Sequence, residues 1–236
     1  MLVIPGLNGH PGMLMQAAPR LFPRWHAYAF NHHTDQALDG VEGLAERALD
    51  LLDPIEPSFV CGESFGGTVA LTLARLAPRR VRGLILLSTF GWHPSGLARR
   101  GVRALALWSF LGGRVGLRMY RAGRLASMPT QLGFGFSGEL LRSYLERPRA
   151  DVAAYRRKAE LSLTFDARPW LSTLQTSTFI VSGRWDPVVP PSAGRELSRL
   201  LPNAELHTLN GGHLVHLVHA DAVGRLIQPW AHSLRI

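Results

Sequence analysis

The sequence of 236 residues lacks the features that mark several classes of protein. It has a single cysteine, Cys61, which excludes a disulfide framework and a multi-cysteine zinc site. It has no long unbroken hydrophobic run: Arg103, Arg114 and Arg118 interrupt the longest apolar stretch, 102–119, which argues against a membrane span. No basic segment followed by a cleavage site stands at the start, so no signal peptide is expected. These absences predict a cytoplasmic protein in a reducing compartment, without a transmembrane segment.

Charged residues are scarce, at 18%, whereas 46% of the residues are apolar. This composition excludes wholesale disorder and is typical of a globular protein that closes a sizeable core. Length and composition together fit a single α/β domain that carries an insertion.

Lysine is almost absent, because Lys158 is the only lysine among 26 basic residues. The formal net charge of +9 lies entirely in the segment 92–163, which has 13 basic and four acidic residues. We interpret this surplus as solvated helix faces, and the alternative is a surface that attracts an anionic substrate, acyl carrier or lipid headgroup. Nucleic-acid binding is not predicted, since the remainder of the chain is neutral and carries no recognisable binding motif.

Short apolar runs rich in β-branched residues alternate with helical patterns along the chain. Strands are expected at 2–4, 25–30, 59–61, 83–90, 178–182 and 204–209, and helices at 38–52, 68–77, 192–201 and beyond residue 213. Strands separated by such helices imply right-handed crossovers and a mainly parallel, doubly wound α/β sheet. The segment 92–163 breaks this alternation with a mostly helical pattern. The sequence therefore predicts a core, 1–91 and 164–236, and an inserted helical cap, 92–163.

A nucleophile motif follows the third predicted strand and opens a helix. Gly62, Ser64 and Gly66 form the pattern G-x-S-x-G, which places a serine on a sharp, strained turn from strand to helix. Larger side chains at the two glycines would collide with neighbouring backbone. The start of a helix also favours negative charge that develops at the serine.

A serine hydroxyl needs a general base, and the base needs an acid that orients it. Asp186 follows the strand that ends at residue 182, and His213 follows the strand that ends near 209. Because parallel strands end at one edge of the sheet, these side chains are expected to meet Ser64 there. Asp166 is the weaker alternative for the acid.

Two motifs resemble those of a known family. The turn P-G-L-N-G at 5–9 and the elbow G-E-S-F-G-G at 62–67 are similar to those of small bacterial hydrolases of the α/β-hydrolase fold superfamily. The likeness covers 1–91 and 164–236 and hardly touches the cap. The first two strands of the full fold have no counterpart here, so the resemblance implies about six parallel strands with 2–4 inside the sheet.

The same resemblance implies roles for particular residues. Ser64, Asp186 and His213 would form a catalytic triad, and the backbone N–H groups of Phe65 and Leu7 would form an oxyanion hole. Many relatives have His-Gly at the position of Pro5-Gly6, which leaves Asn8 as the alternative to Leu7.

The substrate pocket has four candidate residues. His10 is near the turn at 5–9 and could touch the substrate, and an apolar acyl pocket could be lined by Trp92, Trp185 and Leu214. Trp108 and Phe110 are interpreted as ordinary core. No metal site is predicted, since His213 and His219 diverge on a helix and no carboxylate has a ligand-like spacing. No cofactor is predicted either, because no G-x-G-x-x-G motif follows a strand.

The leading functional hypothesis is a cofactor-independent serine esterase that cleaves a small-molecule ester through an acyl-enzyme. An alternative keeps the acyl-enzyme but takes a thioester or transfers an acyl group from an anionic carrier. A third hypothesis is a ligand-binding protein that retains the scaffold without turnover.

Overall fold

The computed structural model describes residues 1–93, 128–129, 131–132, 136–146 and 151–234. The strands in these residues are β1 (Leu2–Ile4), β2 (Tyr28–Ala29), β3 (Ser58–Glu63), β4 (Val81–Leu87), β5 (Thr178–Gly183) and β6 (Ala204–Leu209). The helices are α1 (Gly12–Leu21), α2 (Gly40–Leu49), α3 (Phe65–Leu76), α6 (Gly138–Glu146), α7 (Val152–Thr164), α8 (Arg168–Leu171), α9 (Pro191–Leu200), α10 (Val215–Val218) and α11 (Ala220–Ser233), with a 3-10 turn η1 at Pro78–Arg80.

The six strands form one parallel sheet in the order β2-β1-β3-β4-β5-β6. The predicted α/β class with about six parallel strands is therefore confirmed, and β1 lies inside the sheet as expected. From β1 the chain first adds β2 on one side, and from β3 onward it adds strands on the other side. The boundary between β1 and β3 is thus the topological switch point, where the loops that leave neighbouring strands separate and ligands bind in folds of this kind.

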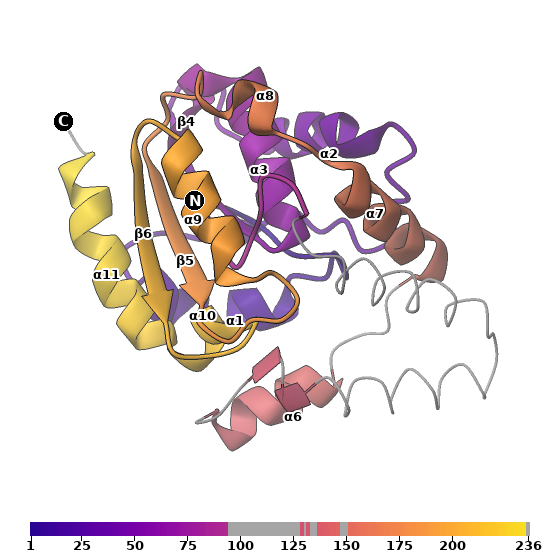
Figure 1. Ribbon diagram of the computed structural model, residues 1–236, viewed down its shortest axis with the longest axis vertical. Coiled ribbons are helices and arrows are strands. Elements are labelled where there is room, and N and C mark those ends of the chain that lie inside the picture. Colours follow the sequence, from indigo (N-terminus) through magenta and orange to yellow (C-terminus); the bar gives the residue numbers. More distant parts are fainter. Residues whose placement is uncertain (94–127, 130, 133–135, 147–150, 235–236) are drawn as a thin grey trace.

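Both faces of the sheet are covered by helices, and β4 shows how its sequence allows this. Leu84 and Leu86 pack into the core beneath α2, α3, α8 and α9, whereas Ile85 and Leu87 pack into the core beneath α1, α10 and α11. All four side chains are fully buried. Successive strand residues point to opposite faces, so a strand buried on both sides reads as a continuous apolar run. Figure 1 shows α3 and α9 on one side of the sheet and α11 on the other.

Several predicted boundaries differ from the observed ones. The strand expected at 83–90 is β4, Val81–Leu87, because the chain turns at Ser88, whose φ is 47°. The strand expected at 25–30 is reduced to the two residues of β2 at the edge of the sheet. Helix α1 was not predicted, and it has Pro19 inside it.

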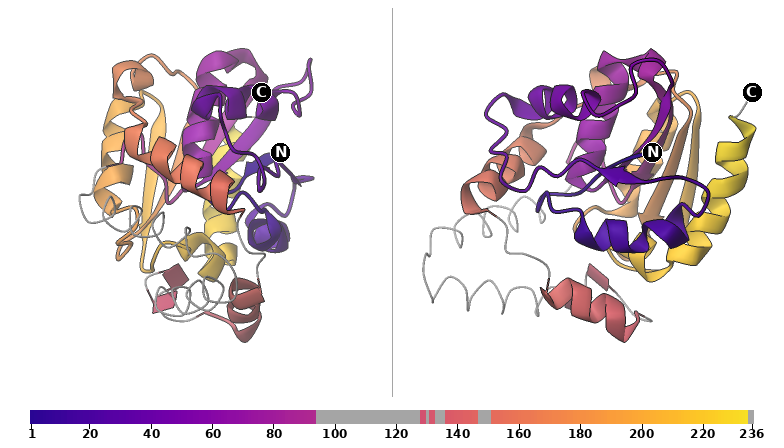
Figure 2. Two further views of the ribbon diagram at one scale, coloured as in Figure 1. Left: turned by 90° about the vertical axis from the view of Figure 1, so that its right-hand side faces the viewer. Right: turned by 180° about the vertical axis from the view of Figure 1, so that it is seen from behind.

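Two described helices belong to the segment 92–163. Helix α6 lies beyond the carboxyl ends of the strands (Figure 2), where Ser143 donates a hydrogen bond of 2.6 Å to Gln16 of α1. Helix α7 packs against α3 and ends at Thr164, one residue past the predicted cap boundary. The larger part of the segment lies outside the described residues, and the division into core and cap stays a prediction.

None of the helices in the described ranges is both long and apolar enough to cross a membrane. The cytoplasmic location stays a prediction.

Candidate active site

Ser64 occupies a one-residue turn between the end of β3 and the start of α3. Its φ of 51° and ψ of −121° lie in a region that costs a non-glycine residue about 1–3 kcal/mol. The turn is held by its backbone: the Ser64 N–H donates to the Leu87 carbonyl at 2.9 Å, and the Thr89 hydroxyl donates to the Ser64 carbonyl at 2.5 Å. Such constraints keep the strained serine in place.

The two glycines of the motif permit close approach of backbone on either side of Ser64. A Cβ added to Gly66 would lie 2.2 Å from the carbonyl oxygen of Ile4 at the end of β1. A Cβ added to Gly62 would lie 2.5 Å from the Cα of Gly67 in α3. Both separations are too short for any side chain, so this geometry requires glycine at both positions.

Three side chains from distant parts of the chain form a hydrogen-bonded series. The Nε2 atom of His213 lies 3.1 Å from the Ser64 Oγ, and the Nδ1 atom lies 2.7 Å from the Oδ2 of Asp186. A carboxylate only accepts hydrogen bonds, so Nδ1 carries the proton and Nε2 is left as the acceptor for the serine hydroxyl. This arrangement can move a proton from Ser64 to the imidazole.

The Asp186 carboxylate is held by more than the imidazole. Its Oδ1 accepts hydrogen bonds from the amides of Val188 and Val189, at 2.8 and 2.9 Å. Asp186 is 3% exposed, whereas the alternative acid, Asp166, is on the surface and pairs with Arg168. The hydrogen bond from Arg168 lowers the pKa of Asp166. The structure thus places Asp186, and not Asp166, against His213.

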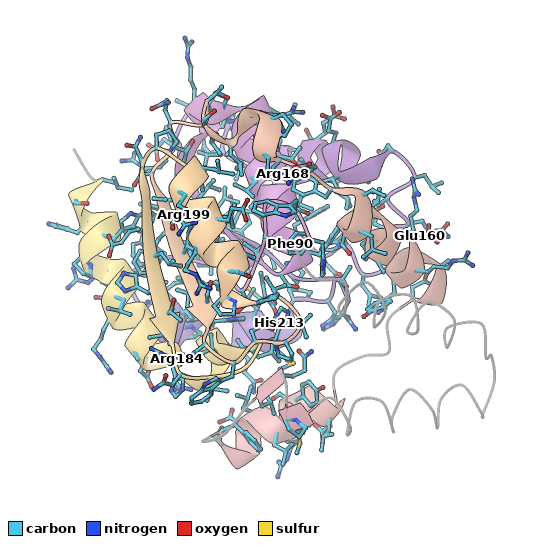
Figure 3. The ribbon with its side chains drawn as sticks, viewed as in Figure 1. Phe90, Glu160, Arg168, Arg184, Arg199 and His213 are labelled. Carbon is cyan, nitrogen blue, oxygen red and sulfur yellow. The ribbon has the colours of Figure 1, made fainter. Side chains whose placement is uncertain are left out.

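The three side chains lie at the carboxyl end of the sheet, after β3, β5 and β6. Figure 3 shows His213 beyond the tips of the β5 and β6 arrows. Ser64 and His213 are 8% and 6% exposed, so the group is largely buried but retains a small opening to solvent. A largely dry site strengthens electrostatic interactions within it.

The turn that follows β1 lies next to the nucleophile. A Cβ added to Gly6 would lie 3.3 Å from the Ser64 Cβ and 3.8 Å from its Oγ. The turn is closed by a hydrogen bond of 2.8 Å from the Gly9 amide to the Gly6 carbonyl. Leu7 stands in this turn and Phe65 directly follows Ser64, so both segments flank the hydroxyl. The role of their amides as oxyanion donors stays a prediction.

The four candidate pocket residues have different surroundings. Leu214 is buried, and its amide donates to the carbonyl of Gln131 at 2.7 Å. Trp185 is 57% exposed, and the Trp92 ring lies 4.9 Å below the guanidinium of Arg168. The Nδ1 of His10 accepts from the amide of Gly12 at 3.1 Å, and its ring packs edge-on to His33. Their pocket role stays a prediction, and Trp108 and Phe110 lie outside the described residues.

Sequence reasoning missed two buried groups near the turn and the elbow. Lys158, on α7, and His32, after β2, are both buried and contact each other, although 126 residues separate them. Thr89 was also missed, since nothing local marks it as a partner of Ser64. A lone lysine in an arginine-rich chain was the one available signal for Lys158.

Another buried histidine, His216, is three residues after His213 in the chain. His216 is fully buried in α10, with its Nε2 3.8 Å from the Glu63 carboxylate. Burial, and then the neighbouring His213, lower the pKa of His216 to about 3. The imidazole therefore stays neutral in the folded protein down to strongly acidic pH.

Replacing His216 with leucine is expected to make the protein more resistant to acid. Between pH 6.5 and about 3 the unfolded chain binds a proton at this imidazole and the folded chain does not, so the free energy of unfolding falls as the pH falls. The free energy of unfolding of the variant minus that of wild type should be about 2 kcal/mol larger at pH 5 than at pH 7. Urea unfolding at both pH values measures this gain. An identical pH dependence in the two proteins would contradict the assignment.

Comparisons with known proteins agree with this geometry. A family model described as the alpha/beta hydrolase fold matches residues 1–220. That match spans most of the chain, and the chain therefore belongs to the α/β-hydrolase fold family.

Individual relatives share less than a third of their residues with this chain. A poly(3-hydroxyalkanoate) depolymerase of Ectopseudomonas oleovorans is 28% identical over 98% of this chain and 74% of its own length. A pimeloyl acyl-carrier-protein methyl ester esterase of Photobacterium profundum is 27% identical over 84% of this chain and 80% of its own. The crystal structure of an enol-lactonase from Burkholderia xenovorans LB400 superposes with a TM-score of 0.79, covering 98% of this chain and 90% of that one at 19% identity. The structural likeness supports the fold.

Proposed function

We propose that this protein is a serine hydrolase that cleaves carboxylic esters through an acyl-enzyme intermediate. The observation that carries the proposal is the hydrogen-bonded series from Ser64 through His213 to Asp186, with separations of 3.1 and 2.7 Å. The names of relatives support the reaction class, since they include a depolymerase and a methyl ester esterase.

The geometry fits each step of such a reaction. Ser64 Oγ attacks the ester carbonyl while His213 Nε2 takes its proton, and Asp186 stabilises the imidazolium that forms. The amides of Leu7 and Phe65 donate to the oxyanion, and His213 returns the proton to the departing alcohol. Water then attacks the acyl-enzyme with the same base and releases the acid. Apart from the substrate and this water, the groups that act in both steps belong to the chain itself.

A fluorophosphonate probe and a short-chain p-nitrophenyl ester test this proposal. Wild type should be labelled at Ser64 and should turn over the ester. Absence of both labelling and turnover would contradict the proposal. Labelling with a single burst of product and no turnover would instead favour the ligand-binding alternative.

The charge distribution favours a second candidate, in which the acyl group is a thioester or ester on an anionic carrier. The surplus of +9 lies in the segment 92–163, and one relative is named for an acyl-carrier-protein ester. Attraction between a basic surface and an anionic carrier speeds their association, and dissolved salt weakens this attraction by screening the charges.

Under this second candidate, kcat/KM for an acyl group on a phosphopantetheine-bearing carrier protein should fall about tenfold from low salt to 0.5 M salt. An uncharged p-nitrophenyl ester serves as the control and should change by less than about twofold. If kcat/KM for the carrier substrate did not change with salt concentration, this second candidate function would be excluded.

A further inference from the structure

His32 binds both ends of the turn at 5–9. The His32 N–H donates to the Gly9 carbonyl at 3.1 Å, at the end of the turn. The His32 Nε2 lies 3.0 Å from the Pro5 carbonyl, at its beginning. A Cβ on Gly9 would lie 2.6 Å from the His32 carbonyl, so the two segments are in direct backbone contact. Both ends of the turn are therefore fixed to the same residue.

Lys158 in turn holds His32. The Lys158 Nζ donates to the His32 carbonyl at 2.8 Å and lies 3.2 Å from the His32 Nδ1. A carbonyl only accepts, so the His32 Nε2 carries the proton toward Pro5, and Nδ1 accepts from the ammonium group. A hydrogen-bonded chain thus runs from α7 through the imidazole to the turn.

This arrangement is unusual in its electrostatics. Lys158 is fully buried, and its two hydrogen-bond partners among the described residues are neutral. The nearby charges that raise the pKa of Lys158 are those of Asp35 and Asp151, and the Asp35 carboxylate is already bound by Arg47 at 2.8 Å. A buried ammonium without a directly paired carboxylate disfavours folding.

Titration properties agree with that geometry. Burial lowers the pKa of Lys158 to about 8. Burial, and then the Lys158 charge, lower the pKa of His32 to about 3, with Asp35 opposing this shift. At neutral pH the imidazole is therefore neutral and the lysine still charged, which is the protonation state that the chain of hydrogen bonds needs.

The orientation of Lys158 differs from that of its neighbours on α7. Glu160, labelled in Figure 3, lies on α7 with its side chain 47% exposed, and Arg157 is 40% exposed. Residues one and two positions apart on a helix point in different directions, so Lys158 alone of these three enters the interior. Arg157 thus offers a matched control, a cation on the same helix that faces solvent.

We propose that Lys158 and His32 are positioning residues for the turn at 5–9, and that they hold the Leu7 amide beside Ser64 for the oxyanion. This inference rests on the proposed function, because it gives the turn its role there. Neither side chain touches the reacting atoms; each acts through the Pro5 and Gly9 carbonyls. Misplacement of a donor by about 1 Å is enough to slow catalysis about 100-fold.

The test compares Lys158→Met, His32→Leu and His32→Gln with Arg157→Met. Lys158→Met and His32→Leu should lower kcat for the p-nitrophenyl ester about 10- to 100-fold with KM within about twofold. They should weaken inhibition by a boronic acid, which forms a tetrahedral anion on Ser64, by a similar factor. His32→Gln keeps a donor toward Pro5 and should recover most of the loss, while Arg157→Met should match wild type.

Thermal unfolding separates positioning from a structural role. Lys158→Met removes a buried charge, so its Tm at pH 7 should equal or exceed that of wild type while kcat falls. Folded variants with wild-type kcat and boronate affinity would overturn the inference. So would failure of both Lys158→Met and His32→Leu to fold, judged by circular dichroism, since that would assign the pair to the fold.

Amide hydrogen exchange of the turn gives a readout that is independent of activity. Exchange at residues 6–9 should be faster in Lys158→Met than in Arg157→Met, and equal rates would contradict the inference. If wild type neither labels with the fluorophosphonate nor cleaves the ester, the proposed function fails, while the exchange rates still decide whether the pair holds the turn.

Discussion

Replacement of Ser64 with alanine is expected to lower kcat for a p-nitrophenyl ester by about 10⁴- to 10⁶-fold and to abolish labelling by a fluorophosphonate. The hydroxyl lies 3.1 Å from the His213 Nε2, and alanine leaves no atom that attacks the carbonyl. Residual activity would come from substrate binding and the oxyanion donors alone. KM should change little, because the substrate is bound by other groups.

Ser88 provides a matched control for this substitution. It is a second buried serine with positive φ, 47°, and its Oγ has no hydrogen-bond partner among the described residues. Ser88→Ala should therefore keep both labelling and turnover near wild-type values. Turnover by Ser64→Ala comparable to wild type would contradict the nucleophile assignment.

The replacement of Asp186 by asparagine is expected to lower kcat by about 10⁴-fold while KM stays similar. The Oδ1 of the new amide can still accept from Val188 and Val189, so the loop keeps its shape. The amide nitrogen would then face the His213 Nδ1 and force the proton onto Nε2. An imidazole with a proton on Nε2 has no lone pair for the Ser64 hydroxyl, and the general base is lost.

Asp166→Asn is the control for this second prediction, since Asp166 was the alternative acid. Its carboxylate pairs with Arg168 on the surface, at 2.6 Å, so the variant should keep kcat within about twofold. Steady-state kinetics from pH 6 to pH 9, with circular dichroism to confirm folding, decides between the two carboxylates. A large loss in Asp166→Asn and none in Asp186→Asn would reverse the assignment.

Local patterns predicted the fold well because they depend on near neighbours in the chain. A run such as Leu84–Leu87 is apolar at every position, which a strand covered on both faces requires. The same logic located β3, β5 and β6, whereas the position of β1 inside the sheet was expected from the family resemblance. Turns were harder to predict: the strand was expected to continue to Phe90, but the backbone turns at Ser88, whose φ is 47°. There the Ser88 amide donates to the Val181 carbonyl, and the Thr89 hydroxyl donates to the Ser64 carbonyl.

The features of the candidate site also fall into those that the sequence predicts and those that depend on the tertiary structure. The sequence alone determined the α/β class, through the alternation of strands and helices, and the glycine–serine turn, through its motif. It placed Ser64 and His213 after strands and offered two acids, Asp186 and the less favoured Asp166. Only the tertiary structure decided which carboxylate faces the imidazole, and only it brought Lys158 to His32 across 126 residues. The physical reason is that burial and long-range hydrogen bonds depend on how α7 and the loop after β2 pack together, and no periodicity within either segment encodes that contact.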